Sequence, residues 1–330
     1  MINKKSADIS ISSVAKLLKK QDNYIILTHS SPDGDTLGAA FALYYGLKAK
    51  GKSAQVLCPD EIPQKYSYFT AKTDSVSKDT ATVIAVDVAD EKLLTSLKEE
   101  FEDKVYLCID HHISNTGYAE NLLLDATASA VCEIIYELLL QMKVKINDVI
   151  AKALYTGIAT DTGCFKYANV TAKTHIITAK LFDFNINAAD INRLMFDTKS
   201  KSLLELEKMV LETAEYHFGD KCILLCVTEK MQKKTGCSGT DLEGIAIISR
   251  SVEGVLAGIT LKQTDEEEFK VSLRTFDPLD ASAICKTLGG GGHKNAAGVT
   301  LKGTLKEVKK TILDAVGESM EKANVWSSAC

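Results

Sequence analysis

Acidic and imidazole side chains gather just behind apolar runs in the first half of the chain, where they could bind metal ions. These residues are His29, Asp33, Asp35, Asp87, Asp110, His111, His112 and Asp161. Clustered carboxylates raise one another's pKa unless cations neutralise them, so two divalent ions would be natural counter-charges. Mixed imidazole and carboxylate ligands suit Mn²⁺ better than Mg²⁺, which prefers oxygen ligands. Paired metal ions suit phosphoester hydrolysis, because they lower the pKa of a bound water and hold the attacking and leaving oxygens.

Each part of this cluster also has an ordinary structural explanation. Asp33-Gly34-Asp35 could be a turn or a helix cap, and Asp161 could cap a helix. The adjacent His111 and His112 could be ordinary surface or core residues whose ring nitrogens are hydrogen-bonded. Asp87 is harder to explain in this way, because a buried acid near the end of an apolar strand needs a partner. Taken together, these ordinary explanations are less convincing, because all these residues fall at the same edge of the predicted sheet.

A second cluster lies near the C-terminus, where four glycines at 289–292 precede His293 and Lys294. Successive glycines expose backbone N–H groups and let an anion approach closely. The residues of this cluster that we expect to bind substrate are Gly290, Gly291, Gly292 and His293. An apolar helix is expected to come after them, and the alternative is a flexible loop. Arg274 ends a predicted strand and could clamp a phosphate through its bidentate fork, or could be a solvated surface residue.

A parallel sheet would bring the first cluster together. Short continuous apolar runs at 24–28, 82–88 and 105–109 predict buried strands. The predicted helices around them span 37–50, 91–102, 131–141 and 148–160. Apolar strands that alternate with helices predict a parallel sheet with helices on both faces, and ligands of such sheets bind beyond the carboxyl ends of the strands.

The second half of the chain predicts a helical connector and a smaller α/β domain. The segment 191–218 is long, charged and helix-like, without obvious strand character. The elements predicted after it are strands at 222–228, 254–262 and 269–274 and helices at 282–288 and 305–316. We therefore predict a catalytic domain at 1–190, a helical linker at 191–218 and a substrate-binding domain at 219–330.

Charge and composition narrow the class of protein. The 330 residues carry a formal net charge of -5, whereas binders of long nucleic acid need a basic face, so a short or small anionic substrate is favoured over a long duplex. The N-terminus has no apolar run behind its lysines, and no stretch approaches the ~20 apolar residues that span a bilayer. We therefore expect a cytoplasmic protein with no membrane association. Nine scattered cysteines without a CxxC pair indicate reduced thiols, more often core residues than catalysts.

Five motifs resemble those of the DHH phosphoesterase superfamily, which takes its name from the motif seen here as Asp110-His111-His112. They are THSSPDGDTLGAA, VIAVDVAD, CIDHHISN, TGIATDTG and, in the part that resembles the DHH-associated C-terminal domain, GGGGHKNAAG. The motifs stand in the family order and cover nearly the whole chain. The resemblance implies an enzyme, namely a metal-dependent phosphodiesterase or phosphatase that uses two divalent ions.

The resemblance also implies roles for individual residues. The ligands of one metal would be His29, Asp33 and Asp87. The ligands of the other would be Asp35, Asp87, His111 and Asp161. Asp110 would orient a ligand, and His112 would contact the scissile phosphate. Asn115, Arg274 and the loop around His293 would contact the rest of the substrate.

Length discriminates within the superfamily. A compact two-domain chain of 330 residues resembles the bacterial oligoribonucleases, or nano-RNases. These degrade very short oligoribonucleotides to mononucleotides and remove the 3′-phosphate of 3′-phosphoadenosine 5′-phosphate. Stand-alone phosphodiesterases of cyclic di-AMP or linear dinucleotides share this architecture and are the alternative. A further alternative is a nucleotide sensor without catalytic activity. Such a protein would lack some of the metal ligands, and none of them is missing from this sequence. A homodimer is the commonest default assembly.

Overall fold

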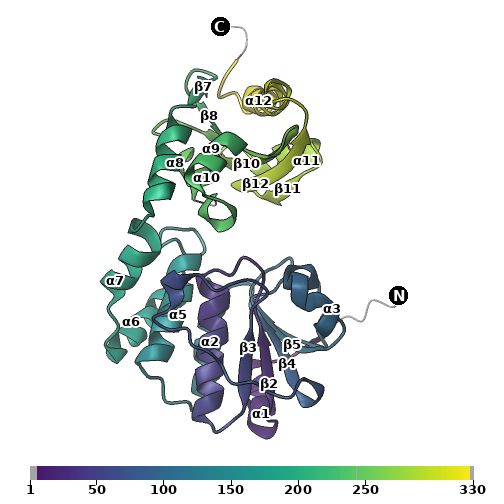
Figure 1. Cartoon of the computed structure of the whole chain (residues 1–330), viewed down its shortest axis with the longest axis vertical. Coiled ribbons are helices and arrows are strands. Elements are labelled where there is room, and N and C mark those ends of the chain that lie inside the picture. Colours follow the sequence, from purple (N-terminus) through teal and green to yellow (C-terminus); the bar gives the residue numbers. More distant parts are fainter. Residues whose placement is uncertain (1–5, 243, 328–330) are drawn as a thin grey trace. The chain divides into compact units, whose positions relative to one another are not determined.

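The computed structural model describes residues 6–242 and 244–327, which divide into two compact units after Thr198 (Figure 1). Each unit has its own sheet with its own hydrophobic cores. The predicted α/β class, with a parallel sheet in the first part of the chain, is therefore confirmed. No helix within the described residues is both long and apolar enough to cross a bilayer.

Parallel strands form the sheet of the first unit, in the spatial order β1-β6-β5-β4-β2-β3. They are β1 (Ala7–Asp8), β2 (Tyr24–Leu27), β3 (Ala54–Leu57), β4 (Thr82–Val86), β5 (Val105–Asp110) and β6 (Asn121–Leu124). The strands β2, β4 and β5 correspond to the three predicted strands, and they are neighbours in the sheet. Their carboxyl ends therefore meet at one edge, as predicted from the sequence.

Helices cover both faces of this sheet. They are α1 (Ile11–Lys20), α2 (Gly34–Ala49), α3 (Lys98–Phe101), α4 (Val131–Gln141), α5 (Asp148–Asp161), α6 (Ala172–Leu181) and α7 (Ala188–Asn192). Ile26 packs in the core that α1, α2, α4 and α5 share, whereas Ile25 packs with Leu94 and Phe101 on the opposite face. The predicted helix at 91–102 is mostly wrong, because a 3₁₀ segment at Glu91–Leu97 with a left-handed Thr95 precedes the short α3.

Capping side chains set where α2 and α5 begin. Oδ1 of Asp33 accepts hydrogen bonds from the backbone N–H groups of Asp35 at 2.9 Å and Thr36 at 3.1 Å. The side chain of Asn147 caps α5 in the same way, accepting from the N–H of Ile150 at 3.0 Å. Because of the Asp33 cap, α2 begins three residues before the predicted start, and Asp35 lies in its first turn.

The second unit has a mixed sheet in the order β11-β12-β10-β9-β8-β7, in which only β8 and β9 run parallel within the described residues. Its strands are β7 (Glu215–His217), β8 (Cys222–Val227), β9 (Ala257–Asp265), β10 (Glu268–Thr275), β11 (Gly291–His293) and β12 (Ala296–Lys302). Its helices are α8 (Lys201–Leu211), α9 (Glu229–Thr235), α10 (Ile245–Ile248), α11 (Ala281–Thr287) and α12 (Leu305–Lys322). The helices α8 to α10 cover one face, and α11 and α12 cover the other.

Two predictions for this half are wrong. The glycine-rich cluster does not lead into a helix: it forms a β-hairpin, in which β11 pairs antiparallel with β12. The segment 191–218 is helical up to Leu211 but then contains the strand β7. The helix α8 also packs in the core of the second unit, with Leu206 and Val210 buried there.

Candidate active site

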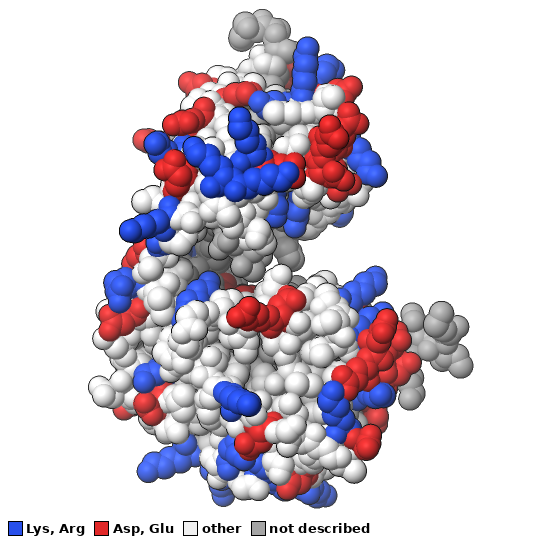
Figure 2. All heavy atoms as spheres, in the orientation of Figure 1, with Lys and Arg blue, Asp and Glu red and all other residues white. Residues whose placement is uncertain are grey.

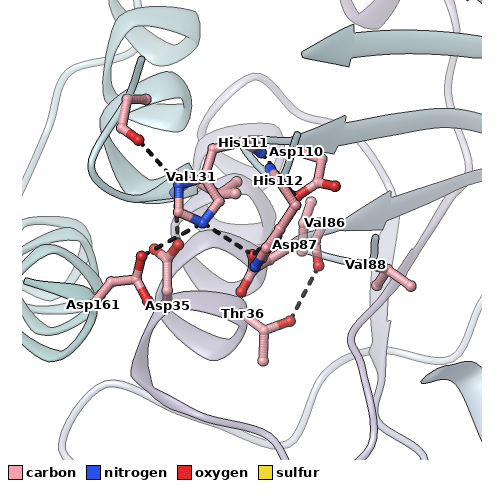
Figure 3. Close-up of polar contacts among 12 residues, drawn as sticks. Asp35, Thr36, Val86, Asp87, Val88, Asp110, His111, His112, Val131 and Asp161 are labelled. Atoms are coloured by element: carbon pink, nitrogen blue, oxygen red, sulfur yellow. Dashed lines mark hydrogen bonds and ion pairs between the residues drawn. The ribbon is translucent and has the colours of Figure 1, made fainter. Parts of the chain in front are cut away.

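The acidic and imidazole residues predicted to act together form one connected cluster at the carboxyl ends of β2, β4 and β5. Figure 3 shows the imidazole of His111 between Asp87 on one side and Asp35 and Asp161 on the other. Two further groups share Asp87, one with His29 and Asp33 and one with the two neighbouring histidines. Within each group the potential ligand atoms lie within 4.8 Å of one another.

The first group is centred on Nε2 of His29. This atom lies 3.7 Å from Oδ1 of Asp33 and 3.6 Å from Oδ2 of Asp87. Nδ1 of His29 lies 2.7 Å from the backbone oxygen of Ser30, and a carbonyl can only accept, so Nδ1 carries the hydrogen. If a cation displaced the proton that Asp33 and Asp87 favour on the ring, this anchor would leave the lone pair of Nε2 directed towards the two carboxylates, which is how a ligand histidine is held.

The second group has the same construction. Nδ1 of His111 donates to the carbonyl of Ala128 at 3.0 Å, and Nε2 lies 3.4 Å from Oδ2 of Asp161 and 3.8 Å from Oδ1 of Asp87. Asp35 completes this group from the first turn of α2.

The N-terminus of α4 holds the Asp35 carboxylate in place. The backbone N–H of Val131 donates to Oδ2 at 2.6 Å, and that of Cys132 donates to Oδ1 at 3.0 Å. The positive end of the α4 dipole also favours a negative charge here. This carboxylate is therefore fixed before any ligand arrives.

These separations fit groups that share a cation better than groups that bond to each other. Several of the nitrogen–oxygen distances exceed a hydrogen bond, whereas two ligands each ~2.1 Å from one ion stand roughly 3.0–3.8 Å apart for angles at the ion between about 90° and about 130°. Oδ1 of Asp87 is buried and finds no hydrogen-bond partner among the described residues. Asp87 also has a left-handed backbone with φ of 59°, and such strain clusters at functional sites. The donor set thus fits divalent ions.

Burial and mutual repulsion govern the pKa values in the cluster. Burial first, and then repulsion from Asp35, raise the pKa of Asp161 to about 8 and hold that of Asp87 well above its ordinary range. Burial likewise raises the pKa of Asp35. For His29, burial lowers the pKa, but the interactions with Asp33 and Asp87 outweigh it and raise the pKa to about 11. Without cations the cluster therefore retains protons that a divalent ion would displace.

Asp110 fixes the ring of His112. Oδ1 of Asp110 accepts from Nδ1 of His112 at 2.9 Å, and Oδ2 accepts from Nδ2 of Asn115 at 2.6 Å. Burial raises the pKa of Asp110, but these hydrogen bonds outweigh it and bring the pKa below its ordinary value. The His112 side chain is 42% exposed. The ionised Asp110 thus keeps the hydrogen on Nδ1 and leaves Nε2 for other contacts.

The amide of Asn115, which was predicted to contact substrate, is engaged within the protein. Its Nδ2 donates to Asp110, and its Oδ1 accepts from the backbone N–H of Gly117 at 2.8 Å. In this arrangement Asn115 holds Asp110 through Oδ2, the oxygen that His112 does not use.

Two thiols lie directly behind the acidic cluster. Sγ of Cys132 is 3.7 Å from the backbone oxygen of Asp35, and Sγ of Cys108 accepts from Nδ2 of Asn115 at 3.6 Å. Burial, followed by the charge of Asp110, raises the pKa of Cys108 to about 12, and burial, followed by the charge of Asp35, raises the pKa of Cys132 well above its ordinary value. Both are therefore protonated thiols. All cysteines in the described part of the chain are free, and most are buried, as predicted.

The residues predicted to bind substrate in the second unit lie on one face of its sheet. Arg274 of β10 and His293 of β11 both pair with Ala296 of β12, and directly paired residues of antiparallel strands project to the same face. Gly291 and Ser272 are related through Gly298 in the same way. The small residues of β11 and β12 thus form a flat surface between the side chains of Arg274 and His293.

Glycine is required in the hairpin itself. Gly292 has φ of 146°, and a Cβ there would lie 2.6 Å from both the backbone oxygen of Ala296 and Cα of Ala297. A Cβ on Gly290 would lie 2.3 Å from the backbone oxygen of Gly298. These glycines allow β12 to pack closely, and β11 stands at the edge of the described sheet, where outer backbone groups are open to a ligand.

A basic pocket adjoins this face and was missed from the sequence. It has a volume of about 340 Å³, and Lys262, Lys270, Ser272 and Arg274 are among its lining residues. Lys262 pairs with Lys270 across β9 and β10, so both ammonium groups lie on the face of Arg274. The signal was the alternation along β10, where Lys270, Ser272 and Arg274 are separated by the apolar Val271 and Leu273. Elsewhere basic and acidic side chains are interspersed over the visible face of each unit (Figure 2).

Comparison with known proteins places this site in a family. The model of the DHH family, N-terminal domain, matches residues 23–158, and that of the DHHA1 domain matches 220–322. A protein of Thermus thermophilus named bifunctional oligoribonuclease and PAP phosphatase NrnA is 33% identical over 319 residues, or 94% of each chain.

Solved structures agree. An exopolyphosphatase-related protein of Bacteroides fragilis superposes with a TM-score of 0.85 at 25% identity, over 95% of this chain and 97% of that one. RecJ of Thermus thermophilus in complex with Mn²⁺ shares the fold, with a TM-score of 0.53 at 15% identity, over 96% of this chain and 54% of that one. By these matches along both of its units, the chain belongs to the DHH family and pairs a DHH domain with a DHHA1 domain.

Proposed function

We propose that the protein hydrolyses very short oligoribonucleotides to mononucleotides and removes the 3′-phosphate of 3′-phosphoadenosine 5′-phosphate. The observation that carries this proposal is the arrangement of two ligand groups around the shared, buried Asp87. Its support on the substrate side is the full-length similarity to a relative named for both activities. Phosphoester hydrolysis is the reaction that such paired cation sites perform well.

The divalent ions would supply an activated water molecule and positive charge for the phosphoryl oxygens. His29, Asp33 and Asp87 would hold one ion. Asp35, Asp87, His111 and Asp161 would hold the other. We propose Mn²⁺ and a count of two ions because each group mixes imidazole with carboxylate and the two groups are distinct.

The chain's own contribution to phosphate recognition centres on His112. Its Nδ1 donates to Asp110, so Nε2 is the ring nitrogen left to face the substrate, and in the imidazolium form its N–H would donate to a phosphoryl oxygen. Asp110 holds the ring in this orientation, and Asn115 holds Asp110. We therefore give Asn115 a positioning role in place of the predicted substrate contact.

The second unit would bind the remainder of the substrate. Arg274 offers a planar fork that matches a phosphate, and His293 lies on the same face of the sheet. Gly290, Gly291 and Gly292 keep the backbone of this hairpin free of side chains, so that a nucleotide can lie flat against it. Lys262 and Lys270 add positive charge beside Arg274. The division into 1–190, 191–218 and 219–330 stays our proposal for the functional parts.

The proposed partner is therefore a small nucleotide and not a long duplex, which agrees with the net charge of -5. A cytoplasmic location and a homodimeric assembly stay predictions from the sequence.

The experiment that tests this function uses the full chain with Mn²⁺ and the linear dinucleotide pApA, and follows AMP by chromatography. Cyclic di-AMP and 3′-phosphoadenosine 5′-phosphate are run in parallel. We expect AMP from pApA and from 3′-phosphoadenosine 5′-phosphate, while cyclic di-AMP persists. Asp87→Asn should abolish turnover, and Asp148→Asn, an exposed acid at the far end of α5, should not. Preferred opening of cyclic di-AMP would establish the alternative, a stand-alone cyclic dinucleotide phosphodiesterase.

A further inference from the structure

A strained turn directly follows Asp161 at the end of α5. Gly163, Cys164 and Phe165 all have left-handed backbone, with φ values of 56°, 59° and 63°. Side-chain-bearing residues rarely adopt this conformation, and a run of them persists only where the surrounding structure enforces it. The turn therefore holds the next residues of the chain in a defined position.

Three anchors hold this turn. The buried Thr162 donates from Oγ1 to the backbone oxygen of Ile158 at 2.6 Å and accepts at Oγ1 from the N–H of Phe165 at 3.0 Å. The Phe165 ring stacks on His175, with centroids 5.6 Å apart and an interplanar angle of 26°. The backbone N–H of Tyr167 donates to the Thr162 oxygen at 3.0 Å. The stacking on His175 thus attaches Phe165 and the turn to α6. Tyr167 follows at the surface.

The ring of Tyr167 lies face-on over Gly163. A Cβ at Gly163 would lie 2.3 Å from Cζ of Tyr167, 2.5 Å from Cε1 and 2.6 Å from Cε2. Distances this similar to three adjacent ring atoms arise only when the approach is through the face of the ring, since an edge-on approach would favour one atom strongly. Only glycine permits this contact. The Tyr167 side chain is 41% exposed, so its exposed surface lies away from Gly163.

We propose that Tyr167 is a platform on which a nucleobase of the substrate stacks, and that it makes the metal centre selective for nucleotides over other phosphate esters. This inference rests on the proposed function and adds a residue to it. Every base has a π-face, so aromatic stacking binds nucleotides without regard to sequence. A ring held rigidly by its own backbone loses little freedom when a base binds. The backbone N–H of Tyr167 is bonded to Thr162, the residue after Asp161, so the turn ties the ring to the end of α5 that carries this candidate metal ligand.

The test compares Tyr167→Ala and Tyr167→Phe on pApA and on two analogues, each of which lacks one of the two bases. We expect Tyr167→Ala to lower kcat/KM for pApA by about 5-fold to about 150-fold, the range for one stacked base. Tyr167→Phe should keep most of the activity, because it keeps the ring. For one of the two analogues, the one without the stacked base, wild type and Tyr167→Ala should differ by less than twofold. Tyr216→Ala, which removes a ring that is 49% exposed on β7, is the matched control and should change nothing.

A structural role for Tyr167 predicts other results. If Tyr167→Ala lost activity equally on pApA and on both analogues, or bound less Mn²⁺ at equilibrium, the ring would be supporting Asp161 and the stacking proposal would be wrong. Unchanged turnover of pApA by Tyr167→Ala would also overturn it while leaving the proposed function intact. If wild type turned over no nucleotide, the proposed function would fail first. In that case equal affinity of wild type and Tyr167→Ala for AMP, measured by calorimetry, would show separately that the platform does not exist.

Discussion

The charge of Asp161 should destabilise the protein when metal is absent, so that Asp161→Asn makes the metal-free chain more stable. Asp161 ends α5, where the negative end of the helix dipole disfavours an anion. Burial and repulsion from Asp35 raise its pKa from 3.8 to about 8. Between these two values the unfolded chain is ionised and the folded chain is protonated, so the free energy of unfolding falls as the pH rises.

The size of the effect depends on this pKa. Each pH unit crossed between the two pKa values costs about 1.4 kcal/mol. At pH 7 about 3.2 units have been crossed, a loss of about 4 kcal/mol, and at pH 5 about 1.2 units, a loss of about 1.6 kcal/mol. The contribution is complete below pH 3.8 and fully lost above about 8. Asn cannot ionise, so Asp161→Asn should gain about these amounts in chelator.

Mn²⁺ should narrow the difference in stability between Asp161→Asn and wild type. At one hundred times its Kd, an ion stabilises the protein it binds by about 2.7 kcal/mol. Loss of a ligand weakens binding at least about tenfold, so the variant should gain at least about 1.4 kcal/mol less from the same Mn²⁺. The substitution should therefore raise the stability of the metal-free protein and lower the stabilisation that Mn²⁺ adds.

Urea titrations at pH 5 and pH 7, with chelator or Mn²⁺, measure these quantities by circular dichroism. Trp326 is the single tryptophan, so its fluorescence reports on the second unit separately. Asp148→Asn is the matched control, because it makes the same chemical change at the exposed start of the same helix, where Lys152 already lowers the pKa. The reasoning is refuted if Asp161→Asn is no more stable than wild type in chelator at pH 7, or if its advantage is as large at pH 5.

Three further perturbations test other parts of the site. His112→Ala should lower kcat for pApA by about 10²–10³-fold, because it removes a donor to the phosphoryl oxygens, while the bound Mn²⁺ measured by elemental analysis stays unchanged. Gly163→Ala should lower the free energy of unfolding by about 1–3 kcal/mol in urea titrations, since its φ is 56° and its Cβ would meet the Tyr167 ring; wild-type stability would refute the face-on contact. Arg274→Lys should raise KM for pApA about tenfold with kcat nearly unchanged, because the charge stays but the fork is lost; an unchanged KM would remove Arg274 from the substrate site.

The sequence predicts the first sheet well because its central strands are buried on both faces. Their side chains are apolar without alternation, and each strand ends at a site residue or leads to one within two residues. The strands β3 and β6 have only four residues each and are partly exposed, so no strong pattern marks them. The local cue for the 3₁₀ segment was also absent, because the charged run at 91–102 has helical composition.

The second unit was harder to predict because strand pairing is a tertiary property. The residues of β12 alternate, with Ala297 and Val299 buried between more exposed neighbours, but the preceding glycines favoured the prediction of a loop and then a helix. The position of Lys262 opposite Lys270 depends on the register of β9 and β10 and cannot be read from either strand alone. The ligand cluster could be predicted because its motifs are local, whereas the direction of the Asn115 amide could not.

The protonated thiols behind the acidic cluster bear on which metals can compete for it. Thiolate sulfur attracts Zn²⁺, Cu⁺ and other soft ions, and a raised thiol pKa weakens this competition because the proton must leave before the sulfur can bind a metal. Cys108 and Cys132 are kept neutral by burial and by the neighbouring carboxylates, so the cluster presents only oxygen and nitrogen atoms. The same neutrality makes these sulfurs poor targets for oxidation. Burial and the carboxylates that attract hard cations thus together disfavour soft ions at the nearby sulfur atoms.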